Sequence, residues 1–153
     1  MQRRHLLAGA AALAATALTA RASARPEIEV WKTPTCGCCK DWIRHLEANG
    51  FAVKFHDVSN AVKNDTRRRI GLADRFGSCH TALVGGYVIE GHVPAREIHR
   101  LLKEKPRALG LAVPGMPVGS PGMDGPEYGG QKDAYDVLLV QRNGDAAVFQ
   151  AYR

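Results

Sequence analysis

The sequence predicts one α/β domain, extended at its C-terminal end by a loop rich in glycine, proline and methionine and then by a β-hairpin. Two observations lead to this prediction. Segments with the alternating polarity of strands take turns along the chain with segments that have the spacing of amphipathic helices. The chain has 153 residues, a length that suits a single domain.

The first half of the expected domain alternates strand, helix, strand, helix. These elements are expected at residues 28–32, 38–48, 51–58 and 60–70. The first helix is amphipathic, because Trp42, Ile43 and Leu46 fall on one face. Asn49-Gly50 then gives the signal of a helix C-terminus. The second helix is polar, so we expect it to lie at the surface.

The second half is expected to be a hairpin followed by a third helix. Two short strands, at residues 81–84 and 87–90, flank Gly85-Gly86, a pair that favours a tight turn. Pro94 suits the first turn of the helix, and Pro106 follows its end. The resulting order, β-α-β-α-β-β-α, is that of a thioredoxin-like domain.

The tail departs from a minimal domain of this type. Residues 110–130 are dense in glycine and proline, lack periodicity and contain Met116 and Met123. We therefore expect an irregular loop, and a loop of this length inside a compact domain is often functional. Residues 135–141 and 146–150 then flank Asn143-Gly144, which predicts a hairpin with a type I′ turn.

The N-terminal segment has the pattern of a secretory signal. Arg3 and Arg4 precede an apolar run at residues 6–20, and Ala22-Ser23-Ala24 provides a cleavage site. We expect residues 1–24 to be a cleaved signal peptide and residues 25–153 to be the mature domain, located in the periplasm without a stable membrane span. Two adjacent arginines fit either the general secretory route or twin-arginine export.

The charge of the chain gives little support to nucleic-acid binding. Loss of residues 1–24 removes three arginines and no acidic residue, so the formal net charge falls from +6 to +3. The densest basic cluster, Arg67-Arg68-Arg69, lies on an expected helix and has no interleaved aromatic residues. We expect this cluster to be a solvated helix face and expect no nucleic-acid partner.

The four cysteines are the candidate functional residues. Cys36, Cys38 and Cys39 are expected at the N-terminus of a helix, where free N–H groups and the helix dipole favour thiolate over thiol. Cys79 precedes the third strand, a junction that faces the first helix in a thioredoxin-like domain. Clustered thiolates suit a soft cation, and copper(I) is the softest common candidate.

Two other interpretations of the cysteines stay open. Cys36 and Cys39 have the Cys-x-x-Cys spacing of thiol-disulfide oxidoreductases, although Cys38 between them is then unexplained. Four cysteines in an oxidising compartment also fit two structural disulfides. Zinc suits the ligands less well, because adjacent cysteines can hardly share one tetrahedral ion. Several copper(I) ions bridged by sulfurs accommodate them better.

Other candidate ligands carry weaker signals. His80 is adjacent to Cys79 but would face the opposite side if both lay within the strand. Met116 and Met123 have soft thioethers that suit copper(I), although core packing explains them equally well. The remaining histidines of the domain lack partners at ligand spacing and are expected at the surface or in the core: His45, His56, His92 and His99.

Several unusual segments of the chain resemble the DUF411 family of exported metal-binding proteins, which includes CopG-type proteins of bacterial copper resistance. These segments lie at residues 34–39, 78–82, 90–95 and 110–123. Together with their surroundings they extend over nearly the whole mature domain.

The resemblance implies a thioredoxin-like periplasmic protein that binds copper through Cys36, Cys38, Cys39 and Cys79. It also implies copper(I) held by thiolates, with copper redox cycling, and hence copper(II), as a further expectation. Copper resistance or homeostasis is the expected role, with more than one copper ion per chain. Periplasmic copper carriers or export machinery are the expected partners.

Overall fold

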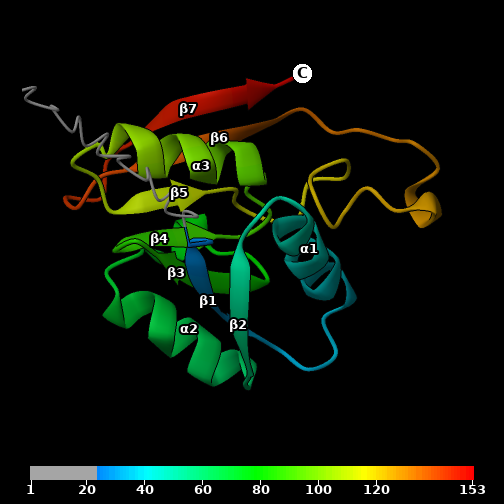
Figure 1. Cartoon of the computed structure of the whole chain (residues 1–153), viewed down its shortest axis with the longest axis horizontal. Helices are drawn as coiled ribbons and strands as arrows, with labels where there is room; N and C mark the ends of the chain where they lie inside the picture. Colours follow the sequence, from blue (N-terminus) through cyan, green and yellow to red (C-terminus); the bar gives the residue numbers. More distant parts are fainter. Residues whose placement is uncertain (1–23) are drawn as a thin grey trace, which may run out of the picture.

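A computed structural model describes residues 24–153 as three α-helices and a seven-stranded mixed sheet (Figure 1). The strands lie in the order β2-β1-β3-β4-β5-β6-β7. The predicted signal peptide falls almost wholly outside the described residues. None of the helices within residues 24–153 combines the length and the apolar character that a membrane crossing requires.

The first four predicted elements are confirmed to within a residue or two. They are β1 (Glu27–Lys32), α1 (Gly37–Ala48), β2 (Ala52–Asp57) and α2 (Asn60–Arg69). β1 and β2 pair in parallel, so α1 forms the crossover between them. Gly50 has a φ of +88° just after the C-cap of α1, as the cap signal predicted.

The predicted hairpin and third helix are also present. They are β3 (His80–Val84), β4 (Tyr87–Glu90) and α3 (Ala95–Glu104). Gly85 and Gly86 both have positive φ, which is the requirement of a type I′ turn. Pro94 is the N-cap of α3 and so precedes its first turn.

The prediction of an irregular loop over residues 110–130 is wrong at two places. β5 (Gly110–Ala112) pairs in parallel with β4 and antiparallel with β6, and it thereby joins the two halves of the sheet. A short 3-10 helix, η2 (Pro126–Tyr128), interrupts the same segment, and another, η1 (Asp74–Phe76), follows α2. A strand of three residues is too short to show an alternating pattern in the sequence. It can be recognised only from its pairing with β4 and β6.

The C-terminal hairpin is confirmed, but its predicted turn type is wrong. β6 (Tyr135–Val140) and β7 (Ala146–Tyr152) pair antiparallel at the edge of the sheet. A type I′ turn needs positive φ at both central residues, and among the described non-glycine residues only Lys105 has positive φ. The turn instead runs from Gln141 to Gly144, where the Gly144 N–H donates to the Gln141 carbonyl.

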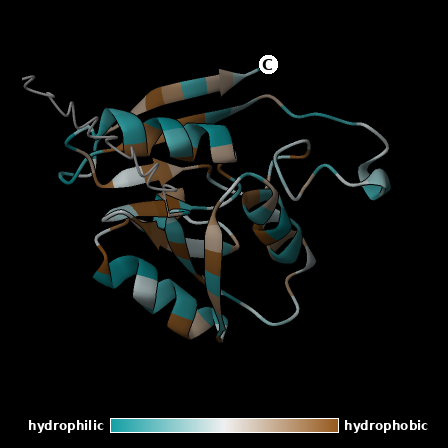
Figure 2. Ribbon diagram, viewed as in Figure 1, coloured by the Kyte–Doolittle hydropathy of each residue, from teal (hydrophilic) through white to brown (hydrophobic). Residues whose placement is uncertain are grey.

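The two faces of the sheet carry separate cores. Trp42, Ile43 and Leu46 of α1 and Ile98 and Leu101 of α3 pack on one face. The segment after α2 covers the other face, and its core consists of Leu72, Phe76, Val88, Leu109, Ala112 and Val140. Hydrophobic residues accordingly concentrate in the strands, whereas α2 is mostly hydrophilic (Figure 2).

The close approach of β4 and β5 depends on a glycine. A Cβ at residue 110 would lie 1.8 Å from the Val88 carbonyl oxygen. We expect Gly110→Ala to push the two strands apart and lower the free energy of unfolding by about 3 kcal/mol, measured by urea denaturation. Gly37→Ala is the matched control, because a Cβ there meets nothing within 4 Å and we expect a change below ~1 kcal/mol. Equal stability of the two variants would contradict this account of β5.

Candidate metal centre

The cysteine motif lies where β1 gives way to α1. Cys36 is the N-cap of α1, and its sulfur accepts a hydrogen bond from the Cys39 N–H at 3.3 Å. Cys38 is partly buried in the first turn, and Cys39 is fully buried. This confirms the predicted position of the motif at the start of a helix, where unpaired N–H groups favour negative charge.

Cys79 reaches the motif from the other side. It lies just before β3, and the β1–β3 pairing brings it beside the start of α1. The four cysteine sulfurs lie within 4.8 Å of one another. The Cys38 sulfur is 3.5 Å from that of Cys36 and 3.8 Å from that of Cys79.

Two of the four cysteines are joined in this structure. Cys36 and Cys39 form a disulfide, whereas Cys38 and Cys79 are free thiols. The donor set for a metal ion therefore depends on the redox state of the motif. After reduction of the disulfide, all four sulfurs are available to a metal ion. While the disulfide is intact, only the sulfurs of Cys38 and Cys79 are available.

The two free thiols differ in acidity. The interaction with Cys79, followed by that with His92, lowers the pKa of Cys38 to about 4. The same interaction with Cys38, together with burial, raises the pKa of Cys79. At neutral pH Cys38 is thus the thiolate of the pair and Cys79 keeps its proton.

Two histidines complete the surroundings of Cys79. The His80 Nδ1 atom lies 3.3 Å from the Cys79 sulfur, and the His92 Nε2 atom lies 3.0 Å from it. Both side chains are fully buried, and burial holds the pKa of His80 well below its ordinary value. Cys79, His80 and His92 form a second group of donor atoms within 4.8 Å of one another.

His92 is the site residue that the sequence prediction placed among surface or core histidines. It follows β4 and is thirteen residues from Cys79 along the chain. The tight turn at Gly91, whose φ is +72°, brings it back to the start of β3. Pairing of β3 with β4 was the signal that could have found it, because a hairpin places the residues at its open ends together.

His80 also differs from its expected position. We expected the His80 side chain to point away from Cys79 because both residues were assumed to lie within the strand. In the structure, however, β3 begins only at His80. Its ring packs against Trp42, with 4.1 Å between ring centroids, and still directs Nδ1 to the Cys79 sulfur. Trp42 is core, as expected, and donates through Nε1 to the Val93 carbonyl at 2.9 Å.

The two methionines lie in different environments. Met116 is 52% exposed, whereas Met123 is buried and its sulfur accepts a hydrogen bond from the Tyr128 hydroxyl at 3.3 Å. No described contact joins either sulfur to the cysteines. Their role as copper ligands stays a prediction.

The segment between β5 and η2 packs over the motif. A Cβ at Gly122 would lie 2.5 Å from the Cys38 carbonyl oxygen and 2.8 Å from the Trp42 nitrogen, so the loop backbone rests directly on α1. The Pro121 carbonyl lies 2.8 Å from His92 Nδ1. Figure 1 shows this segment on the same side of the molecule as α1. The expectation of a functional loop is consistent with this position.

A buried carboxylate holds the Cys79 loop in place. One Glu90 oxygen accepts from the Ser78 N–H at 2.7 Å, and the other accepts from the Thr81 hydroxyl at 2.6 Å. These two residues flank Cys79 and His80. Burial raises the pKa of Glu90, and Arg67 lies 3.4 Å away as its charged partner. Lys63 donates to the Ser78 carbonyl at 2.9 Å.

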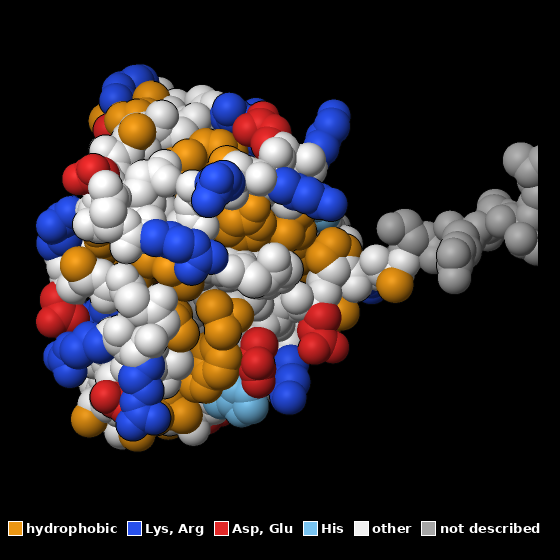
Figure 3. All heavy atoms as spheres, turned by 90° about the vertical axis from the view of Figure 1, so that its left-hand side faces the viewer, with side chains coloured by type: hydrophobic (Ala, Val, Ile, Leu, Met, Phe, Trp, Pro, Cys, Tyr) orange, Lys and Arg blue, Asp and Glu red, His pale blue; other side chains and the backbone are white. Residues whose placement is uncertain are grey.

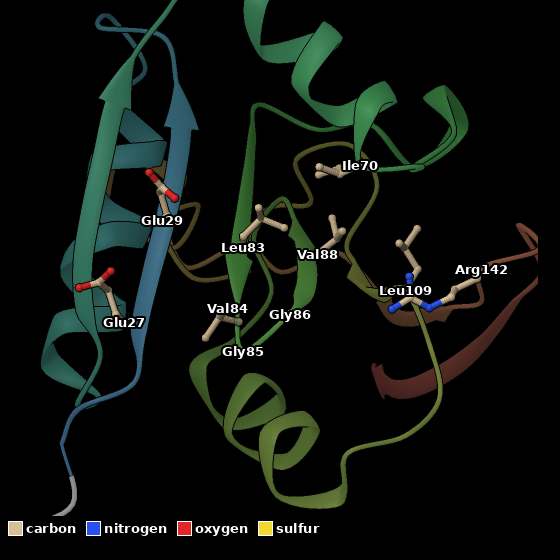
Figure 4. A pocket seen from close by; sticks show the side chains of 10 residues that line it. All are labelled: Glu27, Glu29, Ile70, Leu83, Val84, Gly85, Gly86, Val88, Leu109 and Arg142. Atoms are coloured by element: carbon tan, nitrogen blue, oxygen red, sulfur yellow. The ribbon is translucent and has the colours of Figure 1, made fainter.

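Apart from these two groups, residues 24–153 contain no cluster of histidine, cysteine, aspartate and glutamate donors that could hold a metal ion. A pocket of about 390 Å³ lies on the opposite face of the sheet (Figure 4). Its described lining includes the carboxylates of Glu27 and Glu29 but neither cysteine nor histidine. On the face drawn in Figure 3, lysine and arginine side chains are dispersed among hydrophobic and acidic ones.

Comparison with known proteins identifies relatives of this chain. Residues 76–123 match the family model described as "Protein of unknown function, DUF411". The solved structure "Copper resistance protein copG- Form 1" is 47% identical, with a TM-score of 0.75, and the match covers 82% of this chain and 96% of that one. Its "Form 2" is 46% identical with the same TM-score, covering 84% and 98%. No curated protein matches the chain.

The lowered pKa of Cys38 predicts an unusual alkylation profile. With the Cys36–Cys39 disulfide intact, the iodoacetamide reaction rate of Cys38 should stay flat between pH 6 and 9, because the thiolate is already formed above its pKa of about 4. Intact-mass kinetics measure this rate. Cys79→Ala should restore a rate that rises with pH, because it removes the thiol that donates to the Cys38 sulfur. A steady rise between pH 7 and 9 in the unaltered protein would rule out the assignment.

Removal of the Glu90 charge should destabilise the domain. Glu90→Gln leaves Arg67 buried without this carboxylate, so we expect a loss of about 3 kcal/mol in the free energy of unfolding, measured by urea denaturation. Glu104→Gln is the matched control, because Glu104 pairs with Arg100 at the surface and should matter little. A Glu90→Gln variant as stable as this control would show that the network does not support the fold.

Proposed function

Because this chain belongs to the DUF411 family of CopG-type copper-resistance proteins, we propose that it is a periplasmic protein that holds copper(I) in copper resistance or homeostasis. The observation that carries the proposal is the convergence of four cysteine sulfurs within 4.8 Å. Thiolates are the ligands that copper(I) prefers.

The spacing of the sulfurs supports a site for several ions. Cys38 lies within 4 Å of two other cysteine sulfurs, so an ion on either side of it would share its thiolate. Bridging also relieves the conflict between adjacent Cys38 and Cys39, since each can bind a different ion. We propose a thiolate-bridged site with more than one copper(I) ion, held by Cys36, Cys38, Cys39 and Cys79 after reduction of the disulfide. Copper redox activity is a further part of this proposal.

The scaffold in this proposal is thioredoxin-like. Support comes from the parallel β1–α1–β2 unit, the antiparallel β3–β4 pair beside β1, and a motif at the start of α1. The proposed export rests on the basic, apolar and small-residue pattern of residues 1–24. Copper carriers or export machinery are the proposed partners.

One observation favours a second candidate function. The Cys36–Cys39 disulfide has the Cys-x-x-Cys spacing of a thiol-disulfide oxidoreductase. In that reaction the reduced Cys36 thiolate would attack a substrate disulfide, and Cys39 would then displace the substrate thiol. Two electrons and two protons pass to the substrate as the Cys36–Cys39 disulfide forms. Burial of Cys39 suits a resolving cysteine.

Copper(I) titration separates the two functions. We expect the anaerobically reduced protein to bind more than one copper(I) per chain against a competing chelator and to consume all four thiols. Cys38→Ser and Cys79→Ser should each lower the affinity at least tenfold and reduce the stoichiometry, because each removes a bridging sulfur. Met116→Leu tests the predicted thioether ligand, and His56→Gln serves as a distant control.

Opposite results would change the assignment. Unchanged affinity and stoichiometry in both serine variants would refute the proposed site. Weak copper(I) uptake, combined with rapid reduction of a model disulfide by the copper-free protein, would favour the oxidoreductase.

A further inference from the structure

The face of the sheet opposite α1 carries a hollow with an apolar floor and charged sides. Its volume is about 390 Å³, and its floor consists of Leu83, Val88 and Leu109 (Figure 4). Glu27 of β1 lies on one side of this floor, and Arg142, two residues after β6, lies on the other. The hollow is therefore acidic on one side, apolar in the middle and basic on the other side.

The charges on the two sides are available to a partner. Glu27 and Arg142 are exposed, and within residues 24–153 neither of them forms an ion pair. Glu29, on the acidic side, is already paired with His56. A second hollow of about 330 Å³ shares Arg142 and is also lined by Arg107, so positive charge continues along the basic side.

The distance between the two sides indicates a large ligand. β1 and β6 are four positions apart in the sheet, and neighbouring strands are about 4.8 Å apart, so the two sides are about 19 Å apart. A small molecule does not bridge this distance. An α-helix with its side chains is about 10–12 Å wide, so it fits between the two sides and its own charged side chains can reach both.

Backbone hydrogen bonding favours a helix over an extended segment. The strands under the hollow are β1, β3, β4 and β5, and each of them has a neighbouring strand on both sides. None of them therefore offers a free edge to which a further strand could pair. An extended segment on this apolar floor would leave its N–H and C=O groups without partners, whereas a helix pairs its own.

The helices of this chain do not supply the occupant. The apolar residues of α1 and α3 are buried against the sheet. α2 is mostly hydrophilic, and Val62 is its only large apolar side chain with high exposure (Figure 2). Since no helix within residues 24–153 presents an exposed apolar stripe, a second copy of the described domain does not fit the hollow.

We propose that the hollow is a docking site for an amphipathic helix of a partner protein. The apolar stripe of this helix contacts Leu83, Val88 and Leu109, a basic residue beside the stripe pairs with Glu27, and an acidic residue on the other side pairs with Arg142. Apolar contact provides the binding energy, and the two ion pairs fix the orientation of the helix.

The docking site lies far from the metal centre, so it goes beyond the proposed function and does not depend on bound metal. The turn at Gly85-Gly86 lines the hollow, whereas Cys79 lies at the other end of β3. Glu27 begins β1, which is about 17 Å long and leads at its far end to the cysteine motif. A partner that docks here leaves the metal centre accessible.

A synthetic helix tests the site in the unaltered protein. The probe is a peptide of about 18 residues, or five helical turns, with a stripe of leucines, lysines along one side of the stripe and glutamates along the other. In an NMR titration we expect shifts of the Leu83, Val88 and Leu109 amide signals and a dissociation constant below about 1 mM.

Reversal of the charges on the protein gives a specific signature. Glu27→Lys and Arg142→Glu should each weaken binding by about threefold or more, because each replaces an attraction with a repulsion. The double variant should recover the original affinity, because a half turn of the helix about the normal to the sheet exchanges its two sides. Glu104→Lys is the matched control, since Glu104 is exposed on α3, and it should leave the affinity unchanged.

Three results would overturn the inference. They are absence of shifts at the three floor amides at about 1 mM peptide, single variants that bind as well as the unaltered protein, and a double variant no better than the single ones. Copper(I) titration of the reduced protein with and without the peptide separates this site from the metal centre. Equal copper(I) uptake is the expected result, and competition between peptide and copper(I) would place the peptide at the cysteines and refute the docking site.

Discussion

The buried Glu90 carboxylate is the interaction on which the site depends. Its two oxygens accept from the Ser78 backbone and the Thr81 hydroxyl, and these residues fix the loop that presents Cys79 and His80. Burial of a carboxylate without partners costs several kcal/mol, so the network of hydrogen bonds and Arg67 is needed to keep it in place. The same strand, β4, leads through Gly91 to His92. One end of the β3–β4 hairpin thus fixes three of the donor atoms.

The position of Cys79 between two sets of donors connects the chemistry of the site with its redox state. Toward α1 it faces Cys38, and toward the β3–β4 hairpin it faces the imidazole nitrogens of His80 and His92. The Cys36–Cys39 disulfide removes two soft sulfurs from the first set and leaves the second set intact. Thiolates are the donors that copper(I) prefers, so reduction of the disulfide would provide a larger and softer donor set.

The segment after β5 packs over the cysteine motif and His92. Its backbone touches α1 at Gly122, and its Pro121 carbonyl orients His92. The glycines allow this close approach, because a side chain at residue 122 would collide with the Cys38 carbonyl and the Trp42 nitrogen. The loop therefore packs against the motif and also fixes the tautomer of a histidine that faces Cys79.

The sequence by itself determined the local elements and the location of the thiols. Periodicity, turn residues and cap signals are local properties, so the helices, the two hairpins and the position of the cysteine motif at a helix start could be predicted. The convergence of Cys79 with that motif followed only from the assumed fold. The Cys-x-x-Cys spacing indicated Cys36 and Cys39 as one possible pair, and the structure selected that pair among the alternatives. Tertiary structure alone decided two features: β5, which is a strand only because β4 and β6 pair with it, and the approach of His92 to Cys79, which lie thirteen residues apart. Ligand spacing along a chain does not encode such contacts, because sheet pairing and a glycine turn create them in space.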